Sequence, residues 1–160
     1  MNNKPKAIKV IGTLCIIFSS MAIFSNLMGI MSYYLIGFGE GTNPDEFNSK
    51  HYDPVNYVLY YYVEFCIFMI ILAIGYLIAG INFRKYKWWA NRLIVLLSSV
   101  ALSVFCLVFG IFTLSAIQSQ NPSLAVIPIL LGLLFSVPLI LLIRYIKKPA
   151  IRMHFEKSSE

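Results

Sequence analysis

The residue of this chain best suited to chemistry is Glu64, a carboxylate well inside the apolar stretch 55–83. An ionisable side chain in an apolar helix is costly to bury, so such residues often bind ions or exchange protons. At 1.5 Å per residue, Glu64 is expected about 13 Å from the outer end of its helix. Small and polar residues expected near this depth complete a candidate polar pocket, which consists of Glu64, Tyr60, Tyr61, Asn26, Gly29, Gly110 and Gly132.

These residues, which are expected at one depth in the membrane and form one layer, have two interpretations. In the functional one, an outward-opening pocket lets Glu64 bind a cation or exchange a proton. In the structural one, the glycines allow close helix packing, while Glu64 hydrogen-bonds to a Tyr or Asn or reaches outward to water. We favour packing, because small residues recur at packing spacing in Gly75-x-x-x-Ala79 and Ser99-x-x-x-Ser103.

Other chemistry has little support in the sequence. It contains no nucleophile motif, phosphate-binding loop or paired-carboxylate motif, so we expect no enzyme, no catalytic residues and no cofactor. His51 lies beside acidic residues, but a single His in a polar loop is too little for a metal site. Cys15, Cys66 and Cys106 fall in apolar stretches and are expected to be small packing residues.

The elements that must position these residues are four apolar stretches. Hydrophobic residues make up 59% of the 160 and charged residues only 12%, which is too apolar for a soluble domain of this size. About 20 helical residues cross a bilayer, and four stretches suffice: 7–37, 55–83, 93–117 and 124–146. The sequence predicts an all-α polytopic membrane protein, a four-transmembrane-helix antiparallel bundle forming a single membrane domain over 1–160.

The basic residues predict its orientation. Of the 13 Lys and Arg residues, only Lys50 falls in the outer loop 38–54, which also holds four acidic residues. The others fall before or at the start of the first stretch, in or beside the inner loop 84–92, or at the end of the fourth stretch and in the tail 147–160. Segments rich in Lys and Arg stay in the cytoplasm, so both termini are expected there.

Two basic segments repeat one pattern, Arg-x-x-Lys-x-x-Ala-x-Arg. It runs from Arg84 to Arg92 and again from Arg144 to Arg152. A duplicated helical hairpin explains the repeat. The repeat is also explained if both cytoplasmic helix ends are basic for topological reasons. The sequence leaves both explanations open.

These segments resemble parts of small bacterial four-helix integral membrane proteins. The inner loop, with Trp88, Trp89 and Ala90 among basic residues, is similar to their basic Trp-Ala loop, although Asn91 interrupts it. The tail is similar to their Pro-x-Ile-Arg-x-x-Phe ending, here Pro149, Ile151, Arg152 and Phe155. The resemblance implies a multi-pass protein of the bacterial inner (plasma) membrane and no particular activity.

The function expected from these patterns is a non-enzymatic membrane protein that acts through helix packing, of accessory, immunity or scaffold type. Its expected partners are the lipid bilayer, anionic headgroups at the cytoplasmic rim, and a second copy or another membrane protein. Nucleic acid is not expected, because the positive charge lies along the membrane rim. The alternative is a small oligomeric proton- or cation-coupled transporter that uses Glu64.

Overall fold

The computed structural model describes residues 6–35, 60–118, 122–149 and 151. In these ranges all regular secondary structure is helical, and four helices are long and apolar enough to cross a membrane. This confirms the all-α prediction. The elements are α1 (Lys6–Leu35), α3 (Tyr62–Arg84), α4 (Trp88–Gln118), the short 3-10 helix η2 (Pro122–Ala125) and α5 (Val126–Ile146).

Two helices begin at other residues than expected. The α3 helix begins at Tyr62 rather than at residue 55, which places Glu64 in its first turn instead of about 13 Å along the helix. The α4 helix begins at Trp88 rather than at residue 93, so a turn over residues 85–87 replaces most of the expected inner loop 84–92. The physical reason is burial, since Ala90, Asn91 and Ile94 lie on a buried face from the first turn of α4. The outer loop 38–54, residues 55–59 and residues 152–160 lie outside the described residues.

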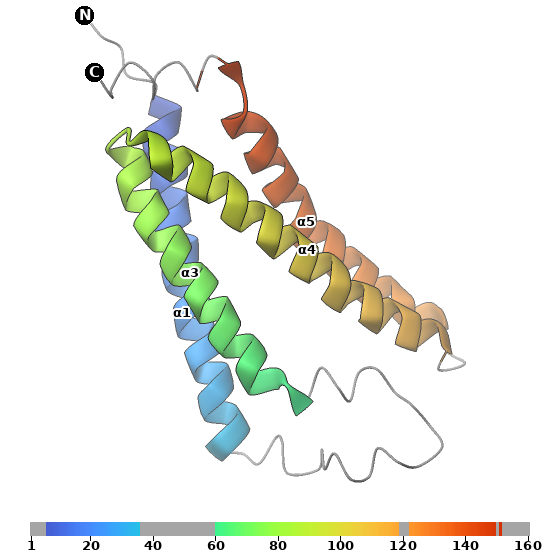
Figure 1. Cartoon of the computed structure of the whole chain (residues 1–160). Helices are drawn as coiled ribbons and strands as arrows, with labels where there is room; N and C mark the ends of the chain where they lie inside the picture. Colours follow the sequence, from blue (N-terminus) through green and yellow to red (C-terminus); the bar gives the residue numbers. More distant parts are fainter. Residues whose placement is uncertain (1–5, 36–59, 119–121, 150, 152–160) are drawn as a thin grey trace, which may run out of the picture.

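The long helices associate as two pairs, α1 with α3 and α4 with α5 (Figure 1). The start of α1, the end of α3, the start of α4 and the end of α5 lie at the same end of the molecule. We call this the basic end, because Arg84, Lys85, Arg92, Lys147 and Lys148 are here. From the basic end the two pairs diverge, which makes the arrangement more open than a single closed bundle.

The α1–α3 pair is joined by two glycines that face each other. A Cβ on Gly12 would lie 2.9 Å from the carbonyl oxygen of Gly80, and one on Gly80 would lie 3.0 Å from that of Gly12. Side chains at either position would therefore push the backbones apart. Small residues at such crossings are typical of membrane helices, which associate by close van der Waals contact.

The α4–α5 pair is joined by aromatic rings instead. The ring centroid of Phe135 on α5 lies 5.5 Å from that of Phe105 and 6.0 Å from that of Phe109 on α4. Gly132 makes room for these rings, since a Cβ there would lie 3.3 Å from the Phe109 Cβ.

The two pairs are connected through α3 and α4 near the basic end. The Tyr76 hydroxyl on α3 donates a hydrogen bond of 2.7 Å to the buried Ser98 Oγ on α4. Around this contact lies one core cluster that draws residues from all four long helices, including Ile8, Phe83, Ile94 and Ile146. The core therefore lies towards one end of the molecule, where the helix pairs meet.

Tyr86, in the turn before α4, has a left-handed backbone with φ 59°. This conformation favours glycine and costs a non-glycine residue about 1 kcal/mol. The Tyr86 side chain is buried in the core cluster, which explains why a large residue occupies the position.

Candidate functional site

Glu64 lies in the first turn of α3, far from the basic end, and its side chain is exposed. Tyr60 and Tyr61 lie beside each other just before α3, with ring centroids 4.8 Å apart. Asn26 on α1 donates its amide to the Ala22 carbonyl of its own helix, at 2.7 Å. These polar side chains all belong to the α1–α3 pair.

The three glycines predicted to share the layer of Glu64 have different neighbours. A Cβ on Gly29 would lie 2.6 Å from the Tyr62 hydroxyl, so Gly29 makes room for that side chain. Gly132 faces Phe109 within the α4–α5 pair, and a Cβ on Gly110 would meet nothing within 4 Å. The structure thus places Gly110 and Gly132 in the other helix pair from Glu64, and the pocket around Glu64 stays a prediction.

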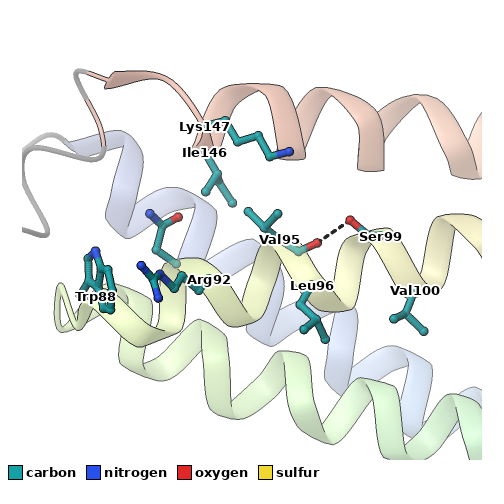
Figure 2. A pocket seen from close by; sticks show the side chains of 9 residues that line it. Trp88, Arg92, Val95, Leu96, Ser99, Val100, Ile146 and Lys147 are labelled. Atoms are coloured by element: carbon teal, nitrogen blue, oxygen red, sulfur yellow. Dashed lines mark hydrogen bonds between the residues drawn. The ribbon is translucent and has the colours of Figure 1, made fainter.

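A groove of about 610 Å³ lies at the basic end between α4 and the end of α5 (Figure 2). Figure 2 shows Ile146 and Lys147 of α5 across this groove from Val95 and Ser99 of α4. Most of the lining is apolar, and the polar atoms are few. Its lining residues are Trp88, Asn91, Arg92, Val95, Leu96, Ser99, Val100, Ile146 and Lys147.

Two cationic side chains, Arg92 and Lys147, line the groove. The Arg92 guanidinium carbon lies 3.5 Å from the ring centroid of Trp88, a cation–π contact that fixes the flat group against the indole. Among the described residues, Glu64 supplies the only carboxylate. It lies about 30 Å along α3 from Arg84 at 1.5 Å per residue, so it does not neutralise the groove.

Asn91 adds a buried polar atom to the same lining. Its side chain is 8% exposed, and its Oδ1 atom has no hydrogen-bond donor among the described residues. A buried acceptor without a donor costs about 1–3 kcal/mol. A donor supplied from the groove would remove this cost.

A stripe of small residues continues from the groove along α4. We define the α4 stripe as Ser99, Ser103, Cys106 and Gly110, spaced so that they share one face of the helix. The two serines and Cys106 are exposed, and Gly110 meets nothing. The expected packing at Ser99 and Ser103 is therefore not made within the described chain. Their hydroxyls donate instead to the carbonyls of Val95 and Ser99, at 2.9 and 3.0 Å.

Sequence reasoning did not find the groove, although two signals for it are present. Trp88 and Arg92 are four residues apart, the spacing at which side chains meet on a helix. Asn91 interrupts the Trp-Ala pattern at the position that the structure buries. The basic residues predict orientation and attraction of anionic headgroups along the whole rim, but the sequence does not reveal which of them line a groove.

In the described ranges, no group of three His, Cys, Asp or Glu residues lies close enough to hold a metal ion. His51 lies outside these ranges. Cys15 and Cys66 are buried, whereas Cys106 is exposed on the α4 stripe.

No protein-family model, curated protein or solved structure matches this chain. The resemblance to small bacterial four-helix membrane proteins stays a prediction.

Proposed function

We propose that this chain is a non-enzymatic membrane protein that acts by packing against other membrane helices, as an accessory, immunity or scaffold subunit. The observation that carries the proposal is the uncovered α4 stripe. Lipid tails are as apolar as leucine side chains, so membrane helices gain by close contact, which small residues permit. The hydroxyls of Ser99 and Ser103 are bonded within α4, so the stripe requires no polar partner.

A second copy of the chain is the first partner to consider. A two-fold axis places the same surface of both copies in the interface, so the α4 stripe of one copy faces the α4 stripe of the other. Two such stripes allow a close approach of the two α4 backbones. Association of this kind requires no charge and no cofactor.

The orientation is part of the proposal. We infer that the basic end faces the cytoplasm, with the helices crossing a bacterial inner membrane in alternating directions. Cysteines at Lys50 and Asn121 should then react with an impermeant thiol reagent on intact cells, and cysteines at Lys87 and Ser158 should not. Labelling at Lys87 from outside would overturn the orientation.

The packing proposal is tested with two matched serines. Ser103 on the α4 stripe and Ser20 on α1 are both exposed, and both bond to a carbonyl of their own helix. Ser103→Leu should lower recovery of an untagged copy with a tagged copy in mild detergent by about tenfold, the effect of losing about 1.4 kcal/mol. Ser20→Leu should leave recovery unchanged.

Three outcomes are informative. Recovery of the untagged copy that depends on Ser103 supports a homo-oligomeric role, and recovery of one defined membrane protein with the same dependence supports an accessory role. Association with nothing, or association unaffected by Ser103→Leu, contradicts the proposal.

A further inference from the structure

We propose that the groove between α4 and α5 binds one anionic phospholipid whose headgroup carries a hydroxyl, phosphatidylglycerol being the simplest. Arg92 and Lys147 bind its phosphate, Asn91 accepts a hydrogen bond from its headgroup hydroxyl, and an acyl chain covers the apolar lining. This site goes beyond the packing role, because it lies at the basic end and requires no second protein.

The phosphate is assigned from the charge of the groove. Arg92 and Lys147 line it together, and the described residues provide no nearby carboxylate. Stacking on Trp88 holds the guanidinium by its face, which leaves its N–H edge available to phosphate oxygens. Basic pockets between transmembrane helices at the cytoplasmic side are known to bind anionic headgroups.

The hydroxyl is assigned from Asn91. Its Oδ1 atom is an acceptor in a side chain that is only 8% exposed, and it has no donor among the described residues. An ionised phosphodiester has acceptors only, so phosphate alone leaves this atom unsatisfied. A headgroup with both a phosphate and a hydroxyl fits both the cations and Asn91.

A lipid is favoured over a free phosphate by the remaining lining. From Trp88 to Val100 the groove follows α4 for about 18 Å at 1.5 Å per residue, which takes it from the rim into the hydrocarbon region. Val95, Leu96 and Val100 are apolar, and the Ser99 hydroxyl is bonded to the Val95 carbonyl, as Figure 2 shows. This surface suits an acyl chain and offers nothing further to a water-soluble anion.

The test compares lipids that differ in one feature, using the full chain in detergent and lipid binding measured by native mass spectrometry. Phosphatidylglycerol has the charge and the hydroxyls, phosphatidylmethanol has the charge alone, and phosphatidylcholine has neither a net charge nor a hydroxyl. The wild type should prefer phosphatidylglycerol over phosphatidylmethanol by about fivefold or more, and over phosphatidylcholine by a larger factor. Glycerol 1-phosphate should not compete.

The variants separate the two contacts. The double variant Arg92→Gln with Lys147→Gln should weaken the binding of both anionic lipids by about tenfold or more. The matched control, Lys85→Gln with Arg144→Gln, removes two exposed cations outside the groove and should change binding less than twofold. Asn91→Leu should abolish the preference for phosphatidylglycerol over phosphatidylmethanol while the lipid-free protein keeps its thermal stability or gains some.

Each contrary result overturns a stated part of the proposal. Equal binding of phosphatidylglycerol and phosphatidylcholine by the wild type contradicts the site itself and requires no variant to fold. Equal losses in the groove and control variants would mean that the charge of the whole rim attracts the lipid. Competition by glycerol 1-phosphate would assign the groove to a soluble phosphate, and an unchanged preference in Asn91→Leu would remove Asn91 from the site.

Discussion

The two helix pairs are similarly apolar but packed in different ways. In the α1–α3 pair, Gly12 and Gly80 bring the two backbones into contact. In the α4–α5 pair, the rings of Phe105, Phe109 and Phe135 contact one another, and a Cβ on Gly110 would meet nothing within 4 Å. The first pair uses Gly12 and Gly80 internally, whereas the second leaves the α4 stripe uncovered.

This difference shows that hydrophobicity alone does not decide which helix faces meet in a membrane. Every long helix offers an apolar surface, and lipid covers such a surface as well as another helix does. Contact is favoured where small residues allow a close approach or where a hydrogen bond crosses the interface. The first condition holds at Gly12 and Gly80, and the second at Tyr76 and Ser98.

The largest effect is expected from adding bulk at the glycine crossing. Gly80→Leu should destabilise the protein by about 3 kcal/mol, because the new side chain would meet backbone that cannot move aside. Gly110→Leu adds the same side chain at an open position of the α4 stripe and should change the free energy of unfolding of the monomeric chain by less than about 0.5 kcal/mol. Unfolding in mixed micelles with increasing amounts of denaturing detergent measures the free energy of unfolding of both variants. Equal losses in Gly80→Leu and Gly110→Leu would contradict the contrast between the two helix pairs.

A smaller loss is expected in the aromatic interface. Phe135→Ala removes two ring contacts but leaves a space that lipid can partly fill, so we expect a loss of about 1.5 kcal/mol. Leu134→Ala is the matched control and should cost much less, because Leu134 is 63% exposed against 46% for Phe135 and makes no ring contact. The same unfolding assay gives both values, and a larger loss for Leu134 would place the α4–α5 contact on the wrong face.

The hydrogen bond between the two pairs should contribute less again. Tyr76→Phe leaves the buried Ser98 hydroxyl without its donor, at a cost of about 1 kcal/mol. Tyr76→Phe with Ser98→Ala removes both partners and should recover part of this loss. If the double variant is less stable than Tyr76→Phe alone, the bond does not connect the pairs.

The smallest effect is expected at Glu64. Its side chain is exposed at the end of α3, so Glu64→Gln should change the free energy of unfolding by less than about 0.5 kcal/mol. In reconstituted vesicles, the wild type and Glu64→Gln should show the same response to a pH gradient. A pH-driven flux that disappears in Glu64→Gln would favour the transporter alternative.

The sequence predicts the four helices well, because about 20 apolar residues in a row are a strong signal. It places the start of α3 too early and that of α4 too late. The basic residues near Trp88 are typical of a loop, although Ala90 and Ile94 continue the helical burial pattern. Depth along each helix gives a shared layer for Gly29, Gly110 and Glu64. Depth does not reveal which helices are neighbours, and that depends on contacts between helix faces that no single helix encodes.

The repeat of basic residues illustrates the same limit. After α3 the next helix begins at Trp88, where the Ala90 amide donates to the Lys87 carbonyl. After α5 the Ile151 amide donates to the Lys148 carbonyl in the same way. By these hydrogen bonds Lys87 corresponds to Lys148, whereas the sequence repeat aligns Lys87 with Lys147. The structural correspondence and the sequence repeat therefore differ by one residue. This favours a shared requirement for a basic, buried turn over an inherited copy.

The central claim, that the α4 stripe is a surface for helix packing, is tested most directly at Cys106. This exposed thiol lies on the stripe, whereas Cys15 and Cys66 are buried, so the natural chain already carries the probe. Mild oxidation of native membranes should give a disulfide-linked dimer, or a defined mixed disulfide with another membrane protein, that disappears in Cys106→Ser and persists in Cys15→Ser. A chain that stays monomeric throughout the oxidation would contradict the account.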